Sequence, residues 1–270
     1  MWKLTQSFAY QGHRIAYDTL GQGAPMVLIH GTPFSSYVWR KIAPLLARDR
    51  QVLVYDLLGY GQSDMPLGED VSLGVQNQVL AALLGHVGFA HPDVIAHDFG
   101  GATALRGHIL NGLDYRRLML IDPVAIRPWG SPFVQHVRAH EAAFAGQPDY
   151  IQHATLKAYI GGAAHRSMAA DTLEAYAAPW RGEPGPAAFY QQIAQMDQRY
   201  TDEIEARMGE VRCPVRLLWG LQDEWIPVAS GRRLSGMLPG CDYSEVDGAG
   251  HLMQEDAPEA IVAAALRFFH

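Results

Sequence analysis

The stretch that decides the fold is VIAHDFGG, residues 94–101. An apolar run, a carboxylate and two glycines in this order predict a buried strand that turns sharply into a helix. The small residues Ala96 and Gly100 lie two positions before and after Asp98, as such a turn requires, because its backbone neighbours approach closely. We therefore expect Asp98 to lie exposed to a ligand at the tip of the turn, and an ordinary helix-capping aspartate is the alternative.

Similar apolar runs recur along the chain. They lie at 26–30, 51–56, 93–97, 118–122, 215–220 and 242–247, and helix-like stretches lie near 36–48, 72–88, 100–112 and 255–269. Runs rich in Val, Leu and Ile are typical of parallel strands buried on both faces. Repeated strand–helix units predict an α/β fold with a mostly parallel, doubly wound sheet. The alternation in residues 7–18 adds an antiparallel hairpin at the start.

The alternation of strand-like and helix-like segments is interrupted between residues 122 and 215. Four helix-like segments, separated by Gly and Pro, fill this gap at 131–146, 150–162, 171–180 and 185–200. An insertion at this place is expected to lie over the carboxyl ends of the strands, where such sheets bind ligands. We predict a core domain of residues 1–127 and 208–270 and a helical cap of residues 128–207.

Composition limits the classes of function. The 270 residues are 49% hydrophobic and 18% charged, with a net charge of -7 and scattered Lys and Arg, so neither a nucleic-acid nor a membrane partner is expected. No apolar run is long enough to span a membrane, and the first residues lack a signal-like core, which favours a cytoplasmic location. Two cysteines, Cys213 and Cys241, give neither a disulfide framework nor a metal cluster, and we expect no cofactor. The oligomeric state is not indicated.

Two further segments carry groups that suit chemistry at Asp98. HGTP, residues 30–33, follows the first parallel-like strand, and a loop there can turn the N–H of Thr32 toward the carboxylate. Together with the N–H of Phe99 it would form a two-donor oxyanion hole. His251, in DGAGHLMQED, follows the last strand-like run and can reach Asp98 as a base. An ordinary Gly-Pro loop and a solvated histidine are the alternatives.

An acid that orients His251 has two candidates. Asp223 lies just after the run at 215–220, and Asp122 ends the run at 118–122. Either carboxylate could hold the imidazole and stabilise its cation. Because strand-end aspartates are common turn formers, we expect one of the two to be structural.

The conjunction of three motifs resembles the α/β-hydrolase superfamily over nearly the whole chain. HGTPFSSYVWRKIAP (30–44), YDLLGYGQSDMP (55–66) and AHDFGGA (96–102) resemble its branch with an aspartate nucleophile, which contains haloalkane dehalogenases, fluoroacetate dehalogenases and epoxide hydrolases. The resemblance implies Asp98 as nucleophile and His251 as base. WGLQDEWIP matches the commoner pattern for the acid and favours Asp223, whereas both dehalogenase families often use the position of Asp122.

Departures from these families favour an epoxide over a halide. Haloalkane dehalogenases carry tryptophan after the nucleophile and often asparagine after the His-Gly pair, and both hold the halide; here these positions are Phe99 and Thr32. Losing two such donors would cost several kcal/mol of transition-state stabilisation, at roughly 3 kcal/mol each. The arginines that fluoroacetate dehalogenases use are replaced by Phe99 and Ala102.

A carboxylate suits displacement at an sp³ carbon, which gives a stable alkyl ester, whereas its attack on an ester gives a reactive anhydride. Water activated by His251 would then hydrolyse the alkyl ester. We expect a small hydrophobic substrate. The candidate binding residues are His30, Phe34, Trp129, Trp225 and the cap residues Tyr159 and Tyr176, whose hydroxyls could serve an alkoxide leaving group.

Three alternatives stay open at this point. A haloalkane dehalogenase could hold its halide with Trp129 or other cap residues. An ester hydrolase could use Asp98 as a base for water. A non-catalytic receptor could bind a small molecule in the capped pocket, although a complete set of histidine and acids argues against this alternative.

Overall fold

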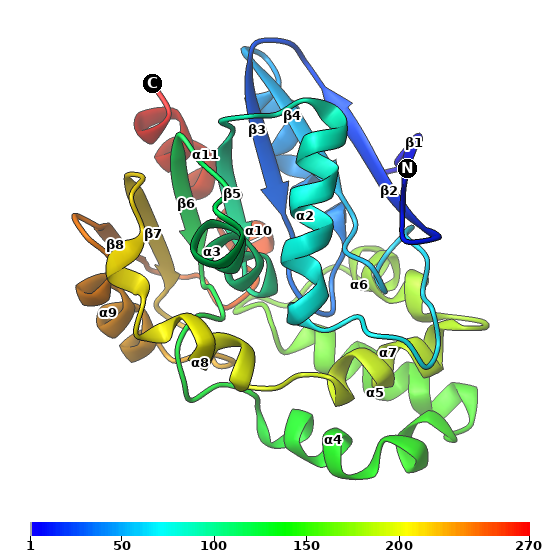
Figure 1. Ribbon diagram of the computed structural model, residues 1–270. Coiled ribbons are helices and arrows are strands. Elements are labelled where there is room, and N and C mark those ends of the chain that lie inside the picture. Colours follow the sequence, from blue (N-terminus) through cyan, green and yellow to red (C-terminus); the bar gives the residue numbers. More distant parts are fainter. Residues whose placement is uncertain (1) are drawn as a thin grey trace.

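The computed structural model describes residues 2–270. Its centre is one eight-stranded sheet with the order β1-β2-β4-β3-β5-β6-β7-β8 (Figure 1). β1 pairs antiparallel with β2 and β2 with β4, and the pairings from β4 to β8 are parallel. The strands are β1 (Gln6–Tyr10), β2 (His13–Leu20), β3 (Ala24–Ile29), β4 (Arg50–Tyr55), β5 (Asp93–His97), β6 (Arg117–Ile121), β7 (Val215–Gly220) and β8 (Asp242–Val246). The predicted fold class and the opening hairpin are confirmed.

Burial along the strands explains their composition. All five residues of β5 are buried, whereas the edge strand β8 has only exposed and half-buried positions. Interior parallel strands are covered by helices on both faces, so their side chains lose contact with water on both sides. In Figure 1, α2 (Leu73–Val87) and α3 (Phe99–Asn111) lie in front of the strands, and α11 (Pro258–Phe268) lies behind them.

The remaining core helices are short. They are the 3-10 helix η1 (Ser36–Lys41), α1 (Ala43–Leu46), α9 (Val228–Met237) and α10 (Met253–Asp256). The helix α9 was not predicted from the sequence, because its residues VASGRRLSGM include few large apolar side chains. Within residues 2–270 no helix has both the length and the apolar content that crossing a membrane requires.

Helices fill the segment between β6 and β7, as expected. They are α4 (Pro132–Ala145), α5 (Asp149–Gly161), α6 (Ala170–Ala177), η2 (Ala178–Trp180), α7 (Gly185–Ala194), α8 (Arg199–Glu205) and η3 (Met208–Glu210). The fourth predicted segment, 185–200, is thus divided into α7 and the start of α8. Figure 1 shows α4, α5 and α7 together beyond the carboxyl ends of the parallel strands.

The loop after α5 is fastened to the loop that carries His251. The N–H of Leu252 donates to the carbonyl of Ala163 at 2.8 Å. The Asp256 carboxylate accepts hydrogen bonds from the N–H groups of His165 (2.8 Å) and Arg166 (2.9 Å) in the loop after α5. It also accepts one from the N–H of Gly250 (2.9 Å) in the loop that carries His251. A buried carboxylate with three backbone donors is well satisfied, so it ties the two loops together.

Candidate active site

Asp98 lies at the sharp turn between β5 and α3. Its φ of 52° and ψ of -119° are unusual for a non-glycine residue, and such strain is typical of functional turns. Gly31 and Gly100 make this turn possible, because a Cβ at Gly31 would lie 2.3 Å from the Asp98 Cβ and one at Gly100 would lie 2.4 Å from the Ile29 carbonyl oxygen. Of the two small residues predicted to flank Asp98, Gly100 is thus required by the close approach of β3, and Gly31 is a further small residue, in the loop after β3.

Two loops deliver polar groups to the Asp98 carboxylate. The N–H of Thr32 donates to Oδ1 at 2.7 Å, and Nε2 of His251 lies 3.2 Å from Oδ2. The N–H of Phe99, the first residue of α3, also helps to hold the pKa of Asp98 down. Thus the structure brings both predicted oxyanion-hole donors and the predicted base to the same carboxylate.

Asp223 is the acid that contacts the histidine. Its Oδ2 lies 2.9 Å from Nδ1 of His251. Its Oδ1 accepts from the N–H groups of Trp225 and Ile226, each at 2.8 Å. Since the carboxylate is held from behind by two backbone donors, it fixes the orientation of the imidazole ring.

Asp122, the alternative acid, lies near this group without contacting the histidine. Its Oδ1 accepts from the Gly220 N–H at 2.7 Å, and within residues 2–270 its buried Oδ2 has no hydrogen-bond partner. Burial raises the pKa of Asp122 well above its usual range, and the negative charge of Asp223 raises it further. Both effects favour the neutral form of Asp122.

The charges of the site depend on one another. Burial alone would raise the pKa of Asp98, but the hydrogen bond and positive charge of His251 outweigh it and lower the pKa. Burial would lower the pKa of His251, but the charge and hydrogen bond of Asp223, followed by those of Asp98, raise it well above its usual value. Both shifts favour the charged forms of Asp98 and His251. His97 stays neutral, since burial and the charge of His251 lower its pKa to about 4.

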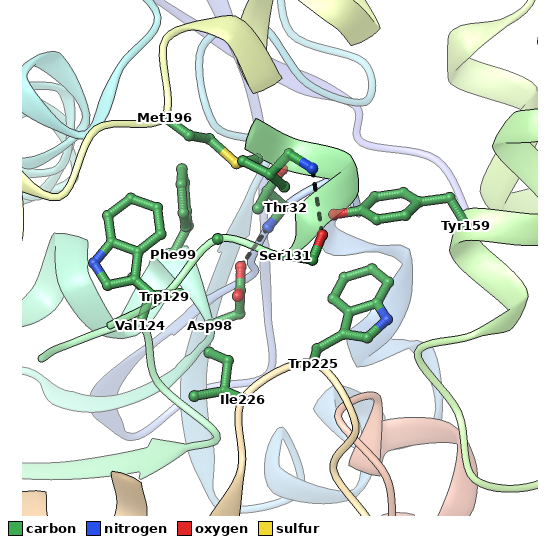
Figure 2. Close-up of a pocket in the computed structure, with 12 residues that line it drawn as sticks. Thr32, Asp98, Phe99, Val124, Trp129, Ser131, Tyr159, Met196, Trp225 and Ile226 are labelled. Carbon is green, nitrogen blue, oxygen red and sulfur yellow. Dashed lines mark hydrogen bonds between the residues drawn. The ribbon is translucent and has the colours of Figure 1, made fainter. Parts of the chain in front are cut away.

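A mostly apolar cavity opens above Asp98, with about 380 Å³ of empty space that includes its opening to solvent. Figure 2 shows Asp98 near Thr32 and Phe99, with Trp129 on one side and Trp225 and Tyr159 on the other. Trp225 stacks on His251 with ring centroids 5.1 Å apart, and Tyr159 stacks on Trp225 at 4.6 Å. The lining residues are Thr32, Asp98, Phe99, Val124, Trp129, Gly130, Ser131, Val134, Tyr159, Met196, Trp225 and Ile226.

Three of the predicted substrate-binding residues do not line this cavity. Both ring nitrogens of His30 are engaged, Nδ1 with the Gly31 carbonyl and Nε2 with the Leu57 N–H, each at 2.9 Å. The Tyr176 hydroxyl donates to Glu255 at 2.5 Å and accepts from Arg40 at 3.1 Å.

Aromatic packing places Phe34 outside the lining. It is buried behind Trp225, with centroids 6.1 Å apart. Trp129 does line the cavity, but its indole N–H donates to Thr201 at 2.8 Å and is not available to a ligand.

Several residues of the cavity were missed by the sequence analysis. Val124 and Ser131 line it from the segment between β6 and α4, Val134 from α4, and Met196 from the loop between α7 and α8. No sequence pattern distinguishes them from ordinary packing residues, because their position depends on how the insertion folds over the sheet. Gln192 is also missed, although its side chain contacts Thr32.

Comparison with known proteins identifies the family. Residues 26–265 match the model of the alpha/beta hydrolase family, so the chain belongs to this family. It is 26% identical to a soluble epoxide hydrolase of Corynebacterium sp. (strain C12), over 96% of this chain and 94% of the relative. It is 27% identical to haloalkane dehalogenase 2 of Mycobacterium bovis, over 95% and 91%.

A solved structure is more similar. The chain superposes on an alpha/beta hydrolase fold protein from Burkholderia ambifaria with a TM-score of 0.97 and 55% identity, over 99% of this chain and 98% of the other. The predictions that the chain is a hydrolase of this family, and that it resembles epoxide hydrolases and haloalkane dehalogenases, are confirmed.

Substitution of Asp223 and substitution of Asp122 should have different effects on the pKa of His251. Asp223→Asn removes a negative charge 2.9 Å from His251 and is expected to lower its pKa by more than about 1 unit. Asp122→Asn replaces an acid whose neutral form is favoured with a neutral amide and should move this pKa by much less. NMR titration of the His251 ring in each variant measures both values. A shift in Asp122→Asn as large as that in Asp223→Asn would contradict the assignment.

Proposed function

We propose that the protein is a cofactor-independent hydrolase whose Asp98 attacks an sp³ carbon, with an epoxide as the substrate class. The observation that carries this proposal is the carboxylate at the strained turn, with a lowered pKa and with His251 at 3.2 Å and the Thr32 N–H at 2.7 Å. An ionised carboxylate in a largely apolar cavity is poised to attack an electrophilic carbon. The relative named a soluble epoxide hydrolase supports this class.

The first step forms the ester. An oxygen of Asp98 attacks one carbon of the epoxide, and the bond between this carbon and the ring oxygen breaks. The ring oxygen becomes an alkoxide, which takes a proton. Tyr159 is the tyrosine of the inserted helices that lines the cavity, and Figure 2 shows its hydroxyl directed toward Ser131 there. Burial, followed by the charge of Asp98, raises the pKa of Tyr159, so its hydroxyl stays protonated and can donate to the alkoxide.

The second step hydrolyses the ester. Once Asp98 is esterified, His251 has lost one of the two negative charges that raise its pKa. It can then release its proton, which restores the hydroxyl of Tyr159 after this group has protonated the alkoxide. The neutral imidazole then takes a proton from water as the water oxygen attacks the Asp98 carboxyl carbon. The N–H groups of Thr32 and Phe99 stabilise the oxyanion, and its collapse frees the diol and restores the carboxylate.

Halide displacement is less well supported, although one relative is named a haloalkane dehalogenase. Phe99 has no polar side-chain donor. The Thr32 hydroxyl donates to Gln192 at 2.7 Å, and the Trp129 indole donates to Thr201 at 2.8 Å. In Figure 2 the indole nitrogen of Trp225 lies on the side of the ring away from Asp98. These engaged donors favour an epoxide, whose alkoxide can be served by Tyr159.

We further propose that residues 128–207 act as a cap over the core of residues 1–127 and 208–270. Helices and loops of this segment supply Trp129, Ser131, Tyr159 and Met196 to the cavity. Apolar walls of this kind exclude water from the first step and suit a small hydrophobic substrate.

A variant without the base should trap the ester. We expect His251→Gln, incubated with a panel of epoxides, to gain the whole mass of the epoxide on the peptide that contains Asp98, because hydrolysis lacks its base. Intact-protein mass spectrometry with peptide mapping measures this gain. A haloalkane panel provides the comparison, since a haloalkane adds only its alkyl group.

Two controls make the outcome decisive. Adding Asp98→Asn to His251→Gln should abolish the adduct, and adding Tyr159→Phe should slow its formation from epoxides but not from haloalkanes. An alkyl-only adduct would replace the epoxide proposal by dehalogenation. A folded His251→Gln variant that gains no mass from either panel would reject the covalent mechanism for these substrates.

The pH dependence of the trapped ester follows from the two pKa shifts. The lowered pKa of Asp98 keeps it ionised and reactive in mild acid, whereas protonation removes His251 as a base. The fraction of enzyme held as ester during turnover should therefore rise as the pH falls through the pKa of His251 in the ester, which the contact with Asp223 still raises. Rapid quenching followed by intact mass measures the fraction, and a fraction that stays constant or falls in acid would contradict this account.

A further inference from the structure

A buried polar cluster joins the inserted helices to the loop that carries Thr32. The Thr32 hydroxyl donates to Oε1 of Gln192 at 2.7 Å, and the Tyr60 hydroxyl donates to the same atom at 2.9 Å. Thr32 follows β3, Tyr60 follows β4, and Gln192 belongs to α7. The three residues are only 4%, 1% and 2% exposed, so water does not compete for these bonds.

Gln192 is only partly satisfied in this cluster. Within residues 2–270 its buried Nε2 has no hydrogen-bond partner. Buried polar atoms without partners are rare in native proteins, and each one calls for a reason beyond packing. An apolar residue of similar volume would fill the same place without an unpaired donor. We therefore expect a role of the hydrogen bonds to Oε1 other than packing.

The position of Thr32 indicates the role of its contact with Gln192. Its N–H donates to Oδ1 of Asp98 at 2.7 Å, so the residue held by Gln192 through its side chain is also the donor to the carboxylate through its backbone. The next residue is held from the same insertion, because the Trp180 indole donates to the carbonyl of Pro33 at 2.9 Å. The inserted segment thus binds the loop on both sides of the peptide bond between Thr32 and Pro33.

We propose that Gln192 is a positioning residue that aims the Thr32 N–H at Asp98 and so makes the oxyanion hole depend on the seating of α7. The inference rests on the proposed function for its effect on rate. An N–H that is misdirected stabilises the developing oxyanion less, while formation of the ester depends on the carboxylate and the leaving group. Loss of the Gln192 contact therefore slows hydrolysis of the ester and spares its formation.

The neighbouring glutamine provides a matched control. Gln191 also joins α7 to the core, since its Nε2 donates to the Pro66 carbonyl at 2.8 Å and its Oε1 accepts from the Gly68 N–H at 2.6 Å. It contacts neither Thr32 nor Asp98 through these bonds. Gln192→Met and Gln191→Met therefore remove side-chain bonds between the same helix and the core, but only the first touches the loop at Thr32.

The test has a kinetic arm. In Gln192→Met, hydrolysis of the ester should slow by about tenfold to a hundredfold. This reduction in rate is at most about that caused by removal of a whole oxyanion donor. Ester should accumulate during turnover, whereas its rate of formation, measured in the His251→Gln background, should stay within about twofold. Gln191→Met should change neither rate. Thr32→Val should act like Gln192→Met, and the double variant should be no slower, because both remove one interaction.

A second arm is independent of the reaction. In protein labelled with ¹⁵N, the Thr32 amide should shift and exchange its hydrogen faster in Gln192→Met but not in Gln191→Met. Gln192→Glu keeps the acceptor oxygen and should preserve the protection. If Gln192→Met does not fold, Thr32→Val removes the same bond from the other side.

The outcomes separate the two claims. An unchanged Thr32 amide in Gln192→Met would overturn the positioning role whatever the reaction is. A changed amide, in a protein whose His251→Gln variant forms no ester, would support the positioning role and reject the proposed function. A changed amide with hydrolysis and formation slowed equally would show that Gln192 is not specific to the second step, and this would overturn the inference.

Discussion

The site depends on the balance of charge between His251 and the two carboxylates that contact it. Burial by itself would favour the neutral forms of Asp98 and His251, because each charge loses its water. The imidazole lies 3.2 Å from Asp98 and 2.9 Å from Asp223, so the three charges stabilise one another. The balance is also what the proposed reaction changes: esterification removes the charge of Asp98 and thereby weakens the hold on the histidine proton.

This balance requires two loops to stay in place, and the inserted helices hold both of them. Asp256 and the Leu252 N–H tie the histidine loop to residues 163–166. Gln192 and Trp180 reach the loop at Thr32 and Pro33. The same segment supplies walls of the cavity, so the shape of the cavity and the alignment of the polar groups both depend on how it packs against the sheet.

The sequence predicts the sheet and the central residues because each is marked by a local pattern. The run at 93–97 and the run at 215–220 coincide with β5 and β7, since strands buried on both faces need uninterrupted apolar residues. Asp98 follows such a run at a sharp turn, whereas His251 follows the edge strand β8 at a Gly-rich turn. The resemblance of WGLQDEWIP to the commoner family pattern favoured Asp223, and the contact with His251 agrees with this preference. The local sequence alone does not separate Asp223 from Asp122, because both follow neighbouring strands and only the direction of their side chains differs.

The inserted helices show the opposite case. Tyr176 and Tyr159 lie in helices of similar character, yet one hydroxyl is bound by Arg40 and Glu255 and the other faces the cavity. Helical periodicity tells which residues share a face but not which face meets the sheet. Gln192 could not be found in this way either, since its importance comes from a contact 160 positions away in the sequence.

The most direct test of the central claim is a single turnover of an epoxide in water labelled with ¹⁸O, with enzyme in excess. If Asp98 attacks the substrate and water then attacks the ester, the label must enter the carboxylate, and the product must carry unlabelled oxygen from Asp98. We predict a gain of one ¹⁸O on the peptide that contains Asp98 and an unlabelled diol. A labelled diol with an unlabelled peptide would mean that water attacks the substrate directly, and it would contradict the role of Asp98 as nucleophile.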